Sequence, residues 1–175
     1  RYQNESIQSV DQYMRAILPL LEGRSETLIV EPGRSMTANA GVLLTEVLYV
    51  KVTEHKNFAV VDAAMNDMLR PSLYQAWMDV QNVETNVNQQ EKTYDVVGPV
   101  CESGDFLAKS RQLTVKEGDC LCLFSAGAYG FVMSSNYNSR PRVAEIMVNE
   151  DSAFVIRQRE TLEELIKGEH LLPEQ

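Results

Sequence analysis

The hydrophobic pattern at the start of the chain changes from a helical period to a continuous apolar run. Apolar residues recur at three- and four-residue spacing over residues 6–21, which predicts an amphipathic helix, and Gly23 follows as its C-terminal cap. Residues 27–30 form a short unbroken apolar run, typical of a strand buried on both faces in a parallel sheet. One helix and one inner strand are too little for a domain. We therefore expect residues 1–34 to be the end of a larger α/β unit.

The pattern after this region favours strands, apart from a short helix predicted at residues 36–40. Residues 149–151 predict a hairpin turn, and the polar, Asn- and Gln-rich stretch 82–92 is typical of a mobile hairpin tip or loop. Several strands at this spacing predict a mostly β fold, arranged as an antiparallel sheet, sandwich or barrel. The predicted strands cover residues 42–53, 58–62, 95–100, 120–125, 144–148 and 153–157.

A last helix is predicted near the C-terminus. Thr161 and Glu164 have the spacing of a capping box, and Gly168 marks the end of the helix. We interpret this helix as a packing element rather than a functional one.

Composition and charge exclude several classes of partner. The 175 residues are 44% hydrophobic and 23% charged, as in an ordinary globular protein, and the formal net charge is −9. This charge argues against nucleic acid and against an anionic membrane surface, but it leaves room for a small anionic ligand held by a few arginines. No apolar run is long enough to span a bilayer, and residues 1–5 do not resemble a signal peptide. With no initiator methionine, we expect a truncated or processed chain.

The three cysteines favour a reducing cytoplasm over a disulfide framework. Cys120 and Cys122 are two residues apart in a predicted strand and face the same way, so a metal pair is one alternative. Only two histidines are present, His55 and His170, and both are distant in sequence. We therefore interpret the two cysteines as small core residues and expect no metal.

Two short segments combine cations with residues that suit anion binding. Gly33 allows close approach to the backbone after the predicted strand, and Arg34 offers a planar fork for a carboxylate or phosphate. The alternative is a Pro-Gly turn with a solvated pair of Glu31 and Arg34. Further along, Arg70 and Tyr74 share a face if their segment is helical, and they would then converge on one anion. The alternative is an exposed arginine and a packed tyrosine.

Two loops bring other chemistry. Cys101 and Glu102 lie in the polar loop 98–105, where a thiol beside a carboxylate suits proton transfer if its pKa is tuned. An unassisted surface cysteine is the alternative. Tyr129 projects from the small-residue loop 125–130, which could pack closely on a phosphate or a ring or could be only a tight bend.

The order of EPGR, DAAMNDMLRPSLY, GPVCESGDFLA and GAYGFVMSSNYNSRPR resembles the C-terminal part of the diaminopimelate decarboxylases, which are fold-type III pyridoxal-phosphate decarboxylases. The motifs run from residue 31 to residue 142 and the flanks fit, so the resemblance covers nearly the whole chain. The combination of RPSLY with CESGD favours this family over ornithine or arginine decarboxylases.

The resemblance implies a (β/α)8 barrel that holds pyridoxal 5'-phosphate, followed by a C-terminal antiparallel β-domain. Residues 1–34 would be the tail end of the barrel, with its last helix and strand, and residues 35–175 would be the β-domain. The family works as a cytoplasmic homodimer with active sites at the subunit interface. It decarboxylates meso-2,6-diaminopimelate to L-lysine and CO2, the last step of lysine biosynthesis.

The resemblance also assigns residues to the cofactor. Glu31, Gly33 and Arg34 would close the last barrel strand at the cofactor phosphate, with Arg34 also reaching the substrate. Tyr129 would contact both the cofactor and the substrate.

Four further residues would serve the substrate. Arg70 and Tyr74 would bind a substrate carboxylate, and Glu102 would bind the distal ammonium group. Cys101 would donate a proton, across the dimer interface, to the carbanion left after loss of CO2. This set matches a substrate with two carboxylates and two ammonium groups.

One part of the family pattern is missing. The lysine that forms the Schiff base, a histidine stacked on the cofactor and a glycine-rich phosphate loop would all lie earlier in the barrel. None of the lysines present has that context, and His55 does not fit the stacking role. We therefore expect a C-terminal fragment that is inactive alone. The alternatives are a non-catalytic β-domain that binds or dimerises, or the same part of a related ornithine- or arginine-type decarboxylase.

Overall fold

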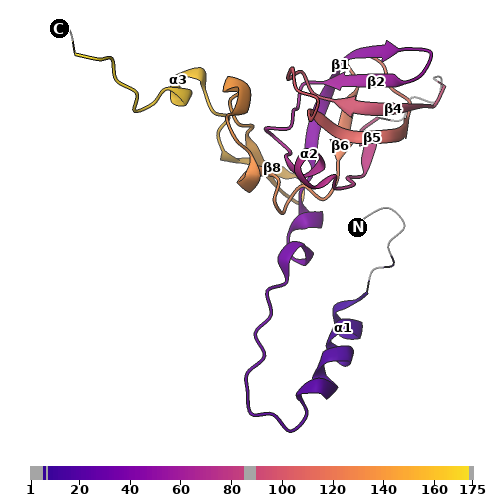
Figure 1. Cartoon of the computed structure of the whole chain (residues 1–175), viewed down its shortest axis with the longest axis vertical. Helices are drawn as coiled ribbons and strands as arrows, with labels where there is room; N and C mark the ends of the chain where they lie inside the picture. The colour runs from indigo at the N-terminus through magenta and orange to yellow at the C-terminus, as the bar shows by residue number, and fades with distance from the viewer. Residues whose placement is uncertain (1–5, 7, 85–89, 174–175) are drawn as a thin grey trace.

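A six-stranded sheet forms the body of the chain in the computed structural model, which describes residues 6, 8–84 and 90–173 (Figure 1). An N-terminal arm and a C-terminal hairpin with a tail project from this body. The strand order is β3-β6-β1-β2-β4-β5. The predicted mostly β fold is confirmed. The strands are β1 (Leu43–Val52), β2 (Asn57–Val61), β3 (Val80–Asn82), β4 (Lys92–Val97), β5 (Phe106–Leu113) and β6 (Cys120–Leu123).

The sheet is mixed rather than purely antiparallel. Four of its neighbouring strand pairs are antiparallel, but β2 and β4 run parallel. A parallel pair needs a long crossover, and the connection over residues 62–91 supplies it with a short helix, α2 (Arg70–Tyr74), and with β3. This crossover also carries several of the residues that the sequence singles out.

The core lies on one face of the curved sheet. In β6 alternate residues, Leu121 and Leu123, point into it, and each fully buried side chain of this size contributes about 1.5–3 kcal/mol. Cys120 and Cys122 alternate with these leucines and are only half-buried. The interpretation of the cysteines as core residues is therefore wrong, because the pleat turns them away from the leucine face.

Two strands were not predicted. β5 contains the polar run 109–112, whose residues lie mostly toward solvent, and β3 is only three residues long. β4 begins at Lys92, inside the stretch predicted as a hairpin tip or loop, and residues 85–89 of that stretch lie outside the described residues. The other predicted strands are confirmed with small shifts at their ends.

The N-terminal arm begins with α1 (Val10–Ile17), where Ser9 and Gln12 form a capping box, and a 3-10 turn, η1 (Leu18–Leu21), extends it. The predicted helix is thus confirmed over these residues, and residue 7 lies outside the described part. Residues 27–30 do not form the predicted buried strand. No strand in the described part of the chain lies beside them, and Ile29 is 83% exposed. A strand needs a neighbour for its backbone groups, which the described residues do not supply.

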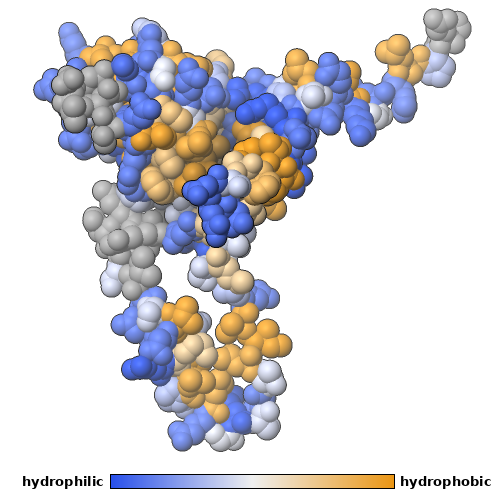
Figure 2. All heavy atoms as spheres, turned by 180° about the vertical axis from the view of Figure 1, so that it is seen from behind, coloured by the Kyte–Doolittle hydropathy of each residue, from blue (hydrophilic) through white to orange (hydrophobic). Residues whose placement is uncertain are grey.

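Two short 3-10 turns, η2 (Gly33–Ser35) and η3 (Ala38–Ala40), connect the arm to β1 where one short helix was predicted. Figure 2 shows apolar side chains both on the arm and over the body of the molecule. The arm therefore exposes surface that a protein of this size normally buries.

The C-terminal part follows the predicted pattern. β7 (Glu145–Asn149) and β8 (Ser152–Arg157) form an antiparallel hairpin, and Thr161 caps the helix α3 (Leu162–Leu165) with the predicted capping box. Two more 3-10 turns, η4 (Phe131–Met133) and η5 (Tyr137–Ser139), lie between β6 and this hairpin. Within the described ranges, none of the helices has the length and apolar character needed to cross a membrane.

Candidate functional site

The segment after β2 is fixed to the neighbouring strand by side-chain hydrogen bonds. Asp62 Oδ1 accepts hydrogen bonds from Thr45 Oγ1 at 2.5 Å and from the backbone N–H of Glu46 at 2.9 Å. Thr45 Oγ1 in turn accepts one from the Ala63 N–H at 3.0 Å. These bonds satisfy backbone donors where the strand ends, so the segment that follows starts from a rigid point.

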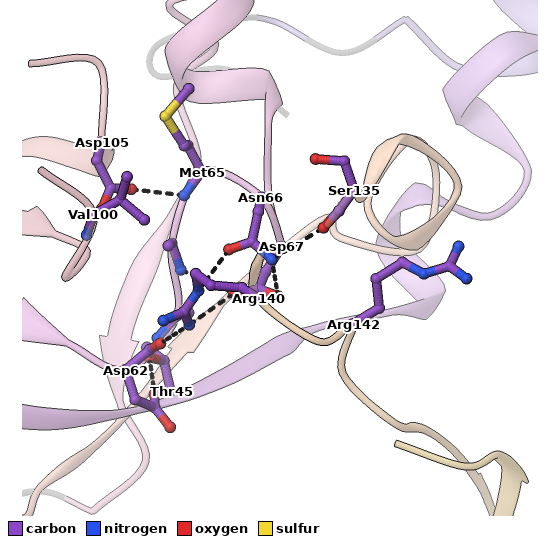
Figure 3. Close-up of polar contacts among 12 residues, drawn as sticks. Thr45, Asp62, Met65, Asn66, Asp67, Val100, Asp105, Ser135, Arg140 and Arg142 are labelled. Carbon is purple, nitrogen blue, oxygen red and sulfur yellow. Dashed lines mark hydrogen bonds and ion pairs between the residues drawn. The ribbon is translucent and has the colours of Figure 1, made fainter. Parts of the chain in front are cut away.

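Asp105 joins this segment to the loop that carries Cys101 and Glu102. It is only 4% exposed, and its two carboxylate oxygens accept hydrogen bonds from the N–H groups of Met65 and Val100, each at 2.7 Å (Figure 3). A Cβ at position 98 would collide with the same carboxylate, so glycine is required there. The Asp105 carboxylate therefore holds both ends of the 98–105 loop against the segment after β2.

Arg140 makes a second connection to the same segment. Its Nε donates to Asn66 Oδ1 at 2.8 Å and its Nη2 donates to the Asp62 carbonyl at 2.6 Å (Figure 3). Asn66, which is 2% exposed, also donates from Nδ2 to the Ser135 carbonyl at 3.2 Å. Asp67 lies 3.6 Å from Arg140. The loop after β6 is thus attached to the same short segment as the 98–105 loop.

The environment of Asp67 is dominated by burial. Burial raises the pKa of Asp67, and the Ala64 N–H and the Arg140 guanidinium oppose the rise without cancelling it. A buried carboxyl group with one cation at 3.6 Å is incompletely compensated, which is the usual cause of such a shift.

Cys101 and Glu102 both lie on the surface of the 98–105 loop. Glu102 Oε1 accepts a hydrogen bond from Ser103 Oγ at 3.3 Å, and Oε2 accepts one from Tyr137 Oη at 3.4 Å. The structure thus places a thiol beside a carboxylate, both open to a ligand or to another chain.

The helix α2 brings Arg70 and Tyr74 next to this loop. Ser72 Oγ donates to the Gly104 carbonyl at 2.5 Å, which packs the helix against the loop. The segment is helical, as convergence of the two side chains requires, but Arg70 is 6% exposed and Tyr74 is 63% exposed. Their joint binding of one carboxylate stays a prediction.

Tyr129 adopts a left-handed backbone conformation with φ +60° and is 44% exposed. A bulky residue in this region stores about 1–3 kcal/mol of strain, and such strain is common at ligand sites. The next residue is tightly packed, because a Cβ at Gly130 would collide with the Ala126 carbonyl. The tyrosine hydroxyl is therefore presented by a rigid turn.

The same loop anchors the arm. The Gly127 N–H donates to the Ala38 carbonyl at 3.0 Å and the Ala126 N–H donates to the Gly41 carbonyl at 2.8 Å. Ser125 Oγ donates to Asn39 Oδ1 at 2.9 Å. The chain that leads from the arm into β1 is thus fixed to the loop of Tyr129.

Glu31, Gly33 and Arg34 lie just before this anchor. Gly33 has φ +57° with no atom within 4 Å of a Cβ position, Glu31 is exposed, and Arg34 is half-buried in the turn η2. A guanidinium beside an open glycine turn is a donor set that fits a phosphate, and the Tyr129 hydroxyl adds a group for a ring. No lysine precedes Lys51 in the sequence, so these residues fit the phosphate but not the covalent attachment of pyridoxal phosphate.

Cys120 and Cys122 were considered in the sequence as a possible metal pair. Across the described residues, no group of three or more His, Cys, Asp or Glu side chains is placed to hold a metal ion. Burial raises the pKa of the Cys122 thiol, with smaller contributions from Cys120 and Asp79.

Sequence reasoning did not assign a role to the residues that hold the site together. Asp105, Asn66 and Arg140 lie inside the quoted motifs, yet their partners are up to 74 residues away in sequence. Asp105 follows the polar run of Glu102, Ser103 and Gly104, so its local pattern gives no signal of a buried role.

Comparison with known proteins identifies relatives of this chain. A family profile described as "Pyridoxal-dependent decarboxylase, C-terminal sheet domain" matches residues 9–127. Diaminopimelate decarboxylase of Pseudomonas fluorescens is 59% identical over 174 residues, which is 99% of this chain and 42% of the relative. The enzyme of Vibrio cholerae is 53% identical over the same shares. The chain thus spans about two fifths of the length of these relatives.

Solved structures of diaminopimelate decarboxylases also match most of this chain and about two fifths of their own length. Diaminopimelate decarboxylase from Helicobacter pylori complexed with L-lysine matches with a TM-score of 0.86 and 44% identity, over 95% of this chain and 41% of that chain. The enzyme from M. jannaschii in complex with L-lysine matches with a TM-score of 0.89 and 35% identity, over 98% and 40%. A viral arginine decarboxylase, at 20% identity and a TM-score of 0.63 over 74% of this chain and 36% of that chain, shares the fold alone.

Proposed function

Because the chain belongs to the pyridoxal-dependent decarboxylases, as their C-terminal sheet domain, we propose that the whole protein converts meso-2,6-diaminopimelate to L-lysine and CO2 with pyridoxal 5'-phosphate. The observation that carries the choice of substrate is the 59% identity to a diaminopimelate decarboxylase over 99% of the chain. The arginine decarboxylase that shares the fold is much more distant, at 20% identity.

The charges on the described elements match this substrate. Arg70, on the helix α2, supplies a cation for a carboxylate, and Tyr74 on the same helix adds a hydroxyl donor. Glu102, on the adjoining loop, supplies the negative charge for the distal ammonium group. In the homodimer proposed below, Glu102 would enter the partner's site, so the groups of opposite sign would meet across the subunit interface.

The cofactor would lie between the arm and the loop of Tyr129. Gly33 and Arg34 would hold its phosphate, with Glu31 beside them, and the Tyr129 hydroxyl would contact its ring and the substrate. The bound cofactor supplies the electron sink for loss of CO2. Arg34 would also contact the substrate and orient the carboxylate that leaves.

Cys101 would deliver the proton that replaces CO2 on the substrate carbon. Its thiol is exposed and adjoins Glu102, which would bind the other end of the substrate. A proton donor next to a substrate-binding carboxylate on one loop is therefore positioned together with the substrate.

We propose that residues 1–34 form the tail end of a cofactor-binding (β/α)8 barrel and residues 35–175 the C-terminal β-domain. The exposed apolar run at residues 27–30 supports this division, because its backbone and side chains require neighbouring strands. We also propose a homodimer in which Cys101 and Glu102 enter the partner's site, since both lie at the exposed end of their loop. Location in a reducing cytoplasm stays a prediction.

The test uses the full-length protein that contains this chain, loaded with pyridoxal phosphate. We expect CO2 release from meso-2,6-diaminopimelate with stoichiometric L-lysine, and little release from ornithine or arginine. Preference for ornithine or arginine would overturn the assignment, and no turnover of any of them would favour a non-catalytic binding domain.

A variant of the full-length protein tests the role of Cys101. Cys101→Ala should slow turnover about 100-fold or more, as loss of a general acid does, while the absorbance of the bound cofactor is kept. Loss of that absorbance in the variant would assign Cys101 to cofactor binding instead.

A further inference from the structure

The segment 135–140, between β6 and β7, touches the site at both of its ends and has no role in the reaction proposed above. At its C-terminal end, Arg140 donates to Asn66 Oδ1 at 2.8 Å and to the Asp62 carbonyl at 2.6 Å. At its N-terminal end, the Ser135 N–H donates to the Asn66 carbonyl at 3.0 Å. The buried residue Asn66 therefore binds both ends of the segment, through its side chain at Arg140 and through its backbone carbonyl at Ser135.

The backbone between these ends is strained. Asn138 and Ser139 are consecutive residues with φ +60° and +53°, a conformation that costs L-residues energy and persists only where the surroundings impose it. Asn136 Nδ2 donates to the Arg140 carbonyl at 3.1 Å and also to Glu160 Oε2, which closes the turn. A single conformation of the turn is therefore enforced from several sides.

Tyr137 stands within this turn, and its hydroxyl donates to Glu102 Oε2 at 3.4 Å. Ser103 Oγ donates to the other oxygen of Glu102 at 3.3 Å. The two donors select one orientation of an otherwise exposed carboxylate. Both bonds are long, and hydrogen bonds in enzyme sites often shorten only when a ligand binds.

We propose that Tyr137 is a positioning residue that orients the Glu102 carboxylate toward the distal ammonium group of the substrate, and that Arg140 holds Tyr137 in place. This inference rests on the proposed function, because it takes Glu102 as the group that meets the ammonium. Tyr137 thereby favours ligands that carry an ammonium and a carboxylate on the distal carbon over those with the carboxylate alone. The preference for the distal ammonium group thus depends on the turn that holds Tyr137 as well as on Glu102.

The test compares two ligands that differ only in that ammonium group. L-Lysine, the proposed product, carries it, and 6-aminohexanoate is the same molecule without it. In the full-length, cofactor-loaded protein, Tyr137→Phe should weaken L-lysine binding about fivefold, which corresponds to about 1 kcal/mol and is the size expected for one long hydrogen bond, with 6-aminohexanoate unchanged by calorimetry. The KM for meso-2,6-diaminopimelate should rise by a similar factor with kcat nearly constant.

Tyr49→Phe is the matched control, since it removes the same hydroxyl from an exposed tyrosine on β1 and should leave both dissociation constants unchanged. Arg140→Lys, which keeps the charge but loses the planar fork, should weaken L-lysine in the same selective way.

An unchanged affinity for L-lysine in Tyr137→Phe, or equal weakening of both ligands, would overturn the inference while the unsubstituted protein still turns over meso-2,6-diaminopimelate. Absence of that turnover in the unsubstituted protein would overturn the proposed function itself, and the inference with it. The two failures are thus distinguishable in one set of measurements.

Discussion

At the scale of single residues, Asp105 is the side chain on which the site loop depends most. Both of its oxygens accept backbone hydrogen bonds at 2.7 Å in a buried position. Asp105→Asn would place an amide N–H against one of these donors, so we expect the free energy of unfolding to fall by about 2–3 kcal/mol. Urea unfolding measures this change. Asp151→Asn, in the exposed hairpin turn, is the control, and an equal effect of both variants would contradict the role of Asp105.

Asp67 gives a prediction of pH dependence. Its pKa is raised above the ordinary value of 3.8, so the folded state holds the proton more tightly than the unfolded state does. Its stabilising contribution is therefore complete below pH 3.8 and is lost as the pH rises through the folded pKa. Asp67→Asn cannot ionise and should remove this loss. Urea unfolding across this pH window should show the variant gaining on the unsubstituted protein as the pH rises, and a constant difference would contradict the prediction.

Candidate site residues could be predicted from the sequence where they are neighbours in the chain. Hydrogen-bond partners that are distant in sequence could not. Cys101 beside Glu102 is visible as a dipeptide, and the structure places both at the surface of one loop. The bond from Arg140 to Asn66 joins residues 74 apart, and nothing in their local pattern distinguishes them from a solvated arginine and asparagine. Buried pairs of this kind depend on the final topology, which is why sequence reasoning missed them.

At the scale of elements, the contact between the arm and the loop of Tyr129 is the most sensitive to substitution. A Cβ at Gly127 would collide with the Thr37 carbonyl and with the Gly41 N–H group. We expect Gly127→Ala to lower the free energy of unfolding by about 2 kcal/mol or more, since backbone atoms on both sides must shift. Gly104→Ala is the control, because its Cβ would meet only side-chain atoms at 3.8 Å or beyond. Equal stability of the two variants in thermal unfolding would contradict this account.

The elements themselves were predicted as well as their local pattern allowed. The strands that alternate or run apolar were found, while β5 was missed because its outward residues are polar and its inward ones are spaced by bulges. The apolar run at residues 27–30 predicts a buried strand, but the described part of the chain contributes no neighbouring strand, and the run stays exposed. Its exposed, unpaired state shows that a local pattern predicts that a segment requires burial but not whether neighbours are present to bury it.

At the scale of the whole molecule, the proposed active site is only partly contained in these 175 residues, and this predicts how the chain behaves by itself. Apart from Arg34 on the arm, the groups proposed for substrate binding and proton transfer lie on the sheet domain. All six lysines also lie there, the first of them being Lys51. With pyridoxal phosphate and meso-2,6-diaminopimelate, we therefore expect the 175-residue chain to release no CO2 above background and to retain no cofactor absorbance after gel filtration. The full-length protein is the positive control. Turnover by the 175-residue chain would show that a lysine of the sheet domain holds the cofactor, and would require the site to be rebuilt around it.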